Sequence, residues 1–414
     1  MFLSQRAAVQ SFLFFSTNRG EFNNMTMQSG NEQLIPLFSV AFRPFFLSGA
    51  LFSLVAMSIW GAVLSGWLTF EPYGSSFWWH AHEMLFGFTV AIIVGFLLTA
   101  VQNWTGLTSV KGKSLGLLWL LWLIARVLLA IDIGLADWVI VFIDLAFLPV
   151  VCVVMARLII TVKLWRNLIF IPILVLMTCS NALMHWGLLN NNAALINQGS
   201  YAMVMLVVML ITVLGGRVFP MFTANGTGTK KVEGIRILEI LTIASTALIA
   251  LIYITGITLP ALLQAALLLL SALCHFIRLI RWRFWVTFKT PLVWSLHLGY
   301  LGIPIGFFLM ALHYFSGDIL LSTVVHALTV GAIGSTILSM ITRVSLGHTG
   351  RKLIVGKALA IAFILVFLTS FVRVFYTLIS DDYSFSMATA ALMWVLAYGI
   401  YSVIFLPKLI TKRL

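Results

Sequence analysis

Histidine is the residue type in this sequence best suited to chemistry, and two histidines lie together in the segment 78–84 (WWHAHEM). Imidazole nitrogen binds transition metals and haem iron. Residues two apart lie about 200° apart around a helix, so His80 and His82 are predicted to face opposite sides and to serve two sites. Glu83 could hold a ligand imidazole by accepting its proton, or relay a proton. The second histidine of HExxH is missing, which excludes that zinc chemistry. A Trp/His belt at the membrane interface is the structural alternative.

Three further histidines are candidate ligands. His326 begins the segment 326–334 (HALTVGAIG), whose small residues permit close approach of another helix or a flat macrocycle. His297 lies in 294–300 (WSLHLGY), and His348 lies in 345–351 (SLGHTGR), which we interpret as a cytoplasmic loop able to bind an anion or simply solvated. We therefore predict metal binding by His80, His82, His326 and His297, and cofactor binding by the same four together with His348.

Ionisable residues at membrane depth form a second group of candidates: Arg126, Arg373, Glu83, Asp144 and Glu239. Each costs about 2.5–3.5 kcal/mol to insert, so each is expected to have a partner or a function. Arg126 and Asp144 are predicted at similar depths on consecutive helices, which favours a structural ion pair. Alternatively, Arg126 or Arg373 binds the propionates of a haem, and both are candidate cofactor-binding residues. No catalytic residue is identified beyond Glu83 as a candidate proton relay.

The elements that must position these residues are membrane-spanning helices. The chain of 414 residues is 61% apolar and only 9% charged, and a crossing needs about 20 apolar residues. The sequence predicts an all-α, polytopic membrane protein with twelve transmembrane helices. The predicted spans are 45–68, 77–101, 115–135, 138–162, 168–189, 194–215, 237–256, 259–280, 291–315, 319–341, 353–379 and 385–406.

The basic residues predict the orientation of these helices. With the exceptions of Arg126 and Arg373, the 25 Lys and Arg residues fall at one side of the twelve predicted spans, and basic loops stay in the cytoplasm. The opposite loops contain acidic residues instead: Glu71, Asp132, Asp137, Asp318, Asp381 and Asp382. Both termini are therefore predicted to be cytoplasmic. The net charge of +13 is explained by topology, and no nucleic-acid partner is expected.

Two regions are predicted: a mobile cytoplasmic tail at 1–35 and the transmembrane domain at 36–414. The connection 216–236 is the longest between predicted helices, and it permits two six-helix halves, 36–216 and 235–414, although no sequence repeat relates them. Cys152, Cys179 and Cys274 form no CxxC or CxxCH motif, so a covalent c-type haem and a zinc knuckle are not expected.

Several segments in order along the chain resemble the NnrS family, and the likeness extends from about residue 36 to the C-terminus. These segments are 42–46 (FRPFF), 79–87 (WHAHEMLFG), 95–106 (GFLLTAVQNWTG), 215–220 (GGRVFP), 296–300 (LHLGY), 326–331 (HALTVG) and 345–351 (SLGHTGR). The resemblance implies a bacterial inner-membrane protein of twelve helices that carries haem and copper. It also implies a role in the response to nitric oxide and nitrosative stress, often beside denitrification.

These expectations define the function to be tested. The missing CxxCH agrees with a noncovalent b-type haem, nitric oxide is the expected small ligand, lipid surrounds the helices, and an electron donor is not identified. Redox activity toward nitric oxide is left open. The alternatives are a twelve-helix secondary transporter and an enzyme like the haem–copper oxidases. The chain lacks the histidine cluster on helices six and seven that oxidase copper sites use, so oxygen reduction is not expected.

Overall fold

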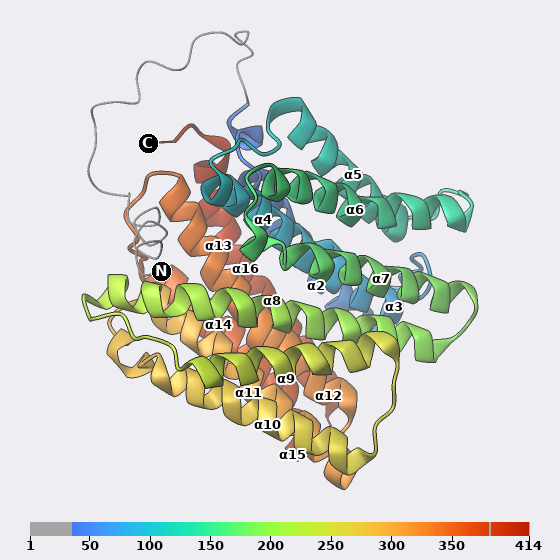
Figure 1. The fold of residues 1–414 in the computed structure, drawn as a ribbon. Coiled ribbons are helices and arrows are strands. Elements are labelled where there is room, and N and C mark those ends of the chain that lie inside the picture. Colours follow the sequence, from blue (N-terminus) through green and yellow to red (C-terminus); the bar gives the residue numbers. More distant parts are fainter. Residues whose placement is uncertain (1–34, 381, 414) are drawn as a thin grey trace. The chain divides into compact units, whose positions relative to one another are not determined.

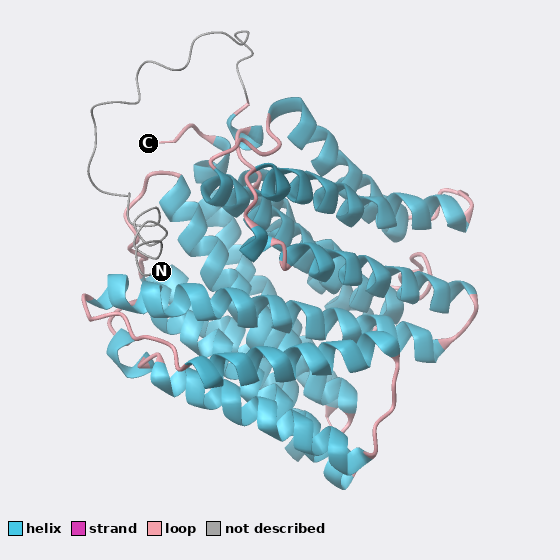
Figure 2. Cartoon of the chain, viewed as in Figure 1, coloured by secondary structure: helices cyan, strands magenta, loops and turns pink. Residues whose placement is uncertain are grey.

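The computed structural model describes residues 35–380 and 382–413. In that part the chain is helical, with twelve helices long and apolar enough to cross a membrane, joined by loops (Figure 2). The predicted all-α fold with twelve membrane spans is confirmed. The predicted tail, apart from its last residue, lies outside the described residues, as does Asp381.

Three successive units of four long helices make up the described chain, and a short 3-10 turn precedes each unit. The first unit contains η1 (Pro36–Phe38), α2 (Phe42–Leu64), a second helix composed of α3 (Ser76–His82), η2 (Glu83–Thr89) and α4 (Val90–Thr105), then α5 (Gly112–Ala130) and α6 (Asp137–Thr161). The second contains η3 (Trp165–Asn167), α7 (Phe170–Leu189), α8 (Ala193–Thr227), α9 (Arg236–Thr255) and α10 (Ala261–Arg281).

The third unit has the same order but more irregular helices. It contains η4 (Phe284–Thr287), α11 (Pro291–Ser316), a second helix composed of α12 (Leu321–His326), η5 (Ala327–Gly334) and α13 (Ser335–His348), a third composed of α14 (Lys357–Phe371), η6 (Val372–Tyr376) and α15 (Thr377–Ile379), and finally α16 (Tyr383–Ile410). The segments η2, η5 and η6 are π-helical. Such segments inside α-helices are rare and are frequently found at functional sites.

The second helix of every unit is deeply buried, as is α11, the first helix of the third unit. The most apolar windows of Ser76–Thr105, Ala193–Thr227 and Leu321–His348 are 83, 72 and 78% buried, whereas most other spans are 33–50% buried. Neighbouring units meet where α6 packs on α7 and α10 packs on α11, and the last helix, α16, packs on α2. Figure 1 shows this return, with the red end of the chain beside the blue helices. The deep helices are therefore the ones that can hold polar sites away from lipid.

The largest difference from the predicted spans concerns the sixth helix. Gly215, Gly216 and Pro220 lead to a predicted end at residue 215, but α8 continues to Thr227. A Cβ at Gly216 would lie 1.8 Å from Nη2 of Arg278, so this glycine is needed for close packing rather than for a turn. The connection 216–236 is therefore mostly helix, and the proposed boundary between two halves falls inside α8.

Candidate functional site

A buried polar cluster lies among three helices of the first unit and the first helix of the second. The second helix of the first unit carries His82 at the end of α3 and Glu83 at the start of η2, and the other members come from α5, α6 and α7: Arg126, Asp144, Asn181 and His185. All six side chains are buried, with His82 and Glu83 at 0% exposure. Six polar side chains without access to solvent require mutual hydrogen bonds.

His82 lies at the centre of these bonds. Its Nδ1 is 2.9 Å from Oε1 of Glu83, and its Nε2 is 2.8 Å from Oδ1 of Asn181 and 3.2 Å from Oδ2 of Asp144. His185 Nε2 lies 3.2 Å from the same Asp144 oxygen, and Asn181 Nδ2 donates to it over 2.6 Å. One carboxylate oxygen thus collects two imidazoles and an amide.

Arg126 balances much of the negative charge. Its Nη1 donates to Oε1 of Glu83 over 2.5 Å, and its Nη2 pairs with Oδ1 of Asp144. The predicted ion pair between Arg126 and Asp144 is therefore confirmed, with Glu83 as an additional partner. One guanidinium against two carboxylates leaves a net charge of −1 when the imidazoles are neutral, which favours a bound cation.

Three side chains of this cluster have the composition of a metal site. One ligand atom from each of His82, Asp144 and His185 lies within 4.8 Å of the other two. Two imidazoles and one carboxylate suit a divalent transition ion, and imidazole suits copper and iron. Oε2 of Glu83 and Nδ1 of His185 are also buried without a hydrogen-bond partner among the described residues. Unpaired polar atoms of this kind are typical of a site that binds an ion or water.

Aromatic residues pack against the histidines of the cluster. The ring of Trp78 stacks on His82 with 4.5 Å between centroids and 12° between planes. Tyr73, in the connection before α3, contacts His185 and Trp78. Burial, with Asp137 and Asp144 as smaller causes, raises the pKa of Tyr73 to about 12. Its hydroxyl stays protonated near neutral pH and can donate toward the cluster.

His80 does not join this cluster, as its predicted opposite orientation requires. It stacks on Trp60 at 4.4 Å and 8°, and the charge of Arg373 acts on it and on His326. The structure thus divides the predicted ligands His80, His82 and His326 between two places. Of the arginines proposed for haem propionates, Arg126 belongs to the first place and Arg373 to the second.

The remaining two predicted histidines lie apart from both places. His297 is buried in α11, where its Nε2 contacts Oγ1 of Thr223 over 2.8 Å and its Nδ1 has no partner among the described residues. His348 is the last residue of α13 and packs against Phe42 with 5.5 Å between ring centroids. Residues 345–348 are therefore helical, and the prediction of a loop there is wrong. Packing on Phe42 explains the extra turn, because it buries the end of the helix.

A second polar network lies between α9, α10 and α11. Arg278, one of the basic residues that the sequence places at the predicted cytoplasmic side, is buried in α10 and pairs with Glu239. It also donates to the Tyr300 hydroxyl over 3.1 Å, and that hydroxyl lies 2.7 Å from Nδ1 of His275. Nε2 of His275 lies 2.9 Å from Oγ1 of Thr246, so both imidazole nitrogens are satisfied. This network ties three helices together and leaves no nitrogen of His275 free for a metal.

The metal ligands predicted from the sequence do not include Asp144 or His185, which belong to the possible metal site of the structure. Asp144 was interpreted only as the partner of Arg126. Their signal was available in part, because Asn181 and His185 are four residues apart and share one face of a helix. Which helix that face meets is decided by the packing of α6 against α7.

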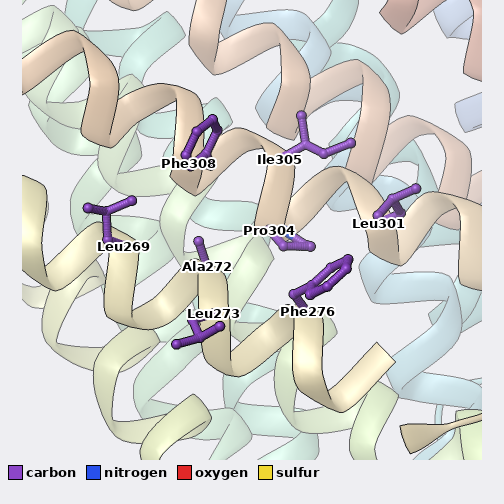
Figure 3. Close-up of a pocket in the computed structure, with 8 residues that line it drawn as sticks. All are labelled: Leu269, Ala272, Leu273, Phe276, Leu301, Pro304, Ile305 and Phe308. Atoms are coloured by element: carbon purple, nitrogen blue, oxygen red, sulfur yellow. The ribbon is translucent and has the colours of Figure 1, made fainter. Parts of the chain in front are cut away.

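An apolar pocket of about 450 Å³ lies elsewhere, between α10 and α11 (Figure 3). Its walls are hydrophobic side chains, and Phe276 and Phe308 among them are each 47% exposed. It contains no candidate ligand. A groove of this chemistry suits a lipid chain rather than a polar substrate.

The family model described as NnrS protein matches residues 36–413. The chain belongs to the NnrS family. No curated protein matches it. The match covers all twelve helices, so the family resemblance of the sequence is confirmed, and the cluster at His82, Asp144 and His185 is a possible metal site within an NnrS-family fold.

Proposed function

We propose that this protein binds haem and copper in the bacterial inner membrane and handles nitric oxide at a metal centre held by membrane-embedded histidines. The buried group His82, Asp144 and His185 is the observation that carries the proposal. It supplies two imidazoles and a carboxylate in a place that lipid and bulk water do not reach. Family membership supplies the expectation of haem, copper and nitric oxide.

The residues around the three ligands fit an imidazole-bound ion. Glu83 lies beside Nδ1 of His82, where it would accept the Nδ1 proton and keep Nε2 available as the ligand atom, as carboxylates beside metal-bound histidines commonly do. Arg126 would hold Glu83 and Asp144 in place through its two ion pairs. A bound reduced copper or iron ion would supply the open coordination position that nitric oxide needs.

Glu83 is also the residue best placed to hold a proton near such an ion. Its Oε1 contacts His82 and Arg126, while its Oε2 has no partner among the described residues. A carboxylate oxygen free on one side can accept a proton from the site or return one to it. Conversion of nitric oxide, unlike its sequestration or sensing, requires a supply of protons and electrons. Glu83→Gln removes the proton-accepting carboxylate, so this variant separates conversion from binding.

The test is metal content. We expect purified protein to bind about one copper ion at this centre, and His82→Ala or His185→Ala to lower copper affinity by at least about tenfold, because each removes a ligand. Equilibrium binding of copper, with the nitrogen hyperfine pattern of Cu(II) in electron paramagnetic resonance, measures both number and ligand type.

His313→Ala is the matched control. His313 also lies near one end of its helix, but its Nδ1 contacts the carbonyl oxygen of Ile319 over 2.5 Å, away from the cluster. Copper binding should be unchanged in this variant. Unchanged binding in His82→Ala and His185→Ala as well would overturn the proposed centre, and a transporter would become the better interpretation if the protein also lacks haem.

A further inference from the structure

The three four-helix units are internal repeats. The dipeptide Thr-Gly closes the second helix of each unit, at 105–106, 227–228 and 349–350, so consecutive copies are 122 residues apart (106 to 228 and 228 to 350). Gly106, Gly228 and Gly350 all have positive φ, at 71, 68 and 80°. A constant spacing with the same local conformation at the same structural position indicates one four-helix unit present three times.

His326 occupies in the third unit the position of His82 in the first. The two histidines are 244 residues apart (82 to 326), which is twice the repeat, and Gly87 and Gly331 keep the same separation. Each histidine is the last residue before a π-helical segment, η2 or η5. The following long helix carries an arginine in both units, Arg126 in the first and Arg373 in the third.

His80 completes the corresponding place in the third unit. It lies on the opposite side of α3 from His82, and it is near enough to His326 and Arg373 for their charges to act on one another. The packing of α12 against η6 agrees with this arrangement. Trp60 stacks on His80 as Trp78 stacks on His82.

The unpaired atoms of this group point to a ligand. Nδ1 of His80 and Nη1 of Arg373 are buried and have no hydrogen-bond partner among the described residues. Nδ1 of His326 contacts the carbonyl oxygen of Ser322 over 2.6 Å, which leaves Nε2 as its free ligand atom. Both histidines keep partly exposed surface in the structure.

We propose that His80 and His326 would both bind the iron of a haem, and that Arg373 would pair with one of its carboxylates. This inference rests on the proposed function, and it assigns the haem to a site separate from His82, Asp144 and His185. Two imidazoles leave no coordination position for nitric oxide. The haem site is then closed, and the first centre is the one open to the gas.

Haem content and copper content, measured together on the whole purified protein, test this assignment. We expect His80→Ala and His326→Ala to lower haem per protein at least tenfold in a pyridine haemochrome assay while copper binding stays at the wild-type level. Arg373→Gln should retain haem with weaker affinity. His82→Ala and His185→Ala are the matched controls, and they should lose copper and keep haem.

A cavity variant separates ligand loss from misfolding. Imidazole added to His326→Gly should restore the low-spin Soret and α bands, which a misfolded protein would not do. Haem retained in both His80→Ala and His326→Ala, haem lost with the controls instead, or wild-type protein without haem would each overturn the inference. With any of these three outcomes, copper binding that is lost only in His82→Ala and His185→Ala would still support the proposed copper centre.

Discussion

Two buried arginines of this protein lie directly against glycines. A Cβ at Gly87 would lie 2.9 Å from Nη1 of Arg126, and a Cβ at Gly216 would lie 1.8 Å from Nη2 of Arg278. A guanidinium is broad and planar, so it needs a helix surface without a side chain if it is to reach its carboxylate. The glycine that faces each guanidinium is therefore as constrained as the charged residues themselves.

Gly216→Ala should destabilise the protein, because the added methyl group displaces Arg278 and leaves Glu239 without its ion-pair partner. Overpacking of this kind costs about 1–3 kcal/mol, which a thermal or mild-denaturant unfolding curve in detergent resolves. Gly399→Ala is the control, since no heavy atom lies within 4 Å of its added Cβ, and it should be neutral or slightly stabilising. Equal stability of the two variants would show that Arg278 adjusts without cost.

Part of the site was predictable from individual residues and part was not. Depth alone predicted the pair of Arg126 and Asp144, and helical geometry predicted that His80 and His82 face apart. The convergence of His185 on Asp144 was not predictable, because it depends on which faces of α6 and α7 meet. Arg278 was counted with the basic residues of the predicted cytoplasmic side, whereas its side chain is buried and Glu239 compensates its burial.

At the scale of the elements, the spans were predicted well except where glycine and proline seemed to end a helix. Gly215, Gly216 and Pro220 all lie inside α8. A proline inside a membrane helix is tolerated when neighbouring groups satisfy the freed backbone. The π-helical segments were not predicted either. A hydrophobic pattern with a period of 3.6 residues predicts an α-helix, and it does not show where one turn contains an additional residue.

The direction of the helices remains a prediction that two connections can test. Lys230 lies between α8 and α9, and Asp318 lies between α11 and α12. A reporter enzyme active only in the periplasm should be inactive when fused at Lys230 and active when fused at Asp318, because the basic loops are retained in the cytoplasm. Activity at Lys230 or inactivity at Asp318 would contradict the orientation of both termini.

At the scale of the whole molecule, one four-helix plan is used three times with different polar contents. The cluster of His82, Asp144 and His185 joins the first unit to α7 of the second, the second unit is tied to α11 of the third through Arg278, and the third contains His326 and Arg373. The spacing of 122 residues explains why no repeat relates two halves of the chain. The groups at His82 and at His326 then have the proposed metal and haem chemistry, and the network around Arg278 holds helices together.

This division predicts two different responses to nitric oxide. Nitric oxide should change the magnetic resonance signal of the ion at His82, Asp144 and His185, because an open position accepts it. The Soret band of the reduced haem should stay in place, because a haem held by two histidines has no open position. Carbon monoxide is the control ligand, and it should leave the same band unchanged. A complete Soret shift with either gas would show an open haem.

The π-helical segment η2 makes the first site depend on chain length. A π-helical turn contains more residues than an α-helical turn, so the helix before η2 is rotated relative to α4 in a way that continuous α-helix would not allow. Each residue accounts for about 100° of rotation. Deleting one residue between Glu83 and Thr89 would let the helix regularise and would turn His82 away from Asp144. An in-frame deletion there would remove the site while leaving every ligand in the sequence, which makes this stretch intolerant of shortening.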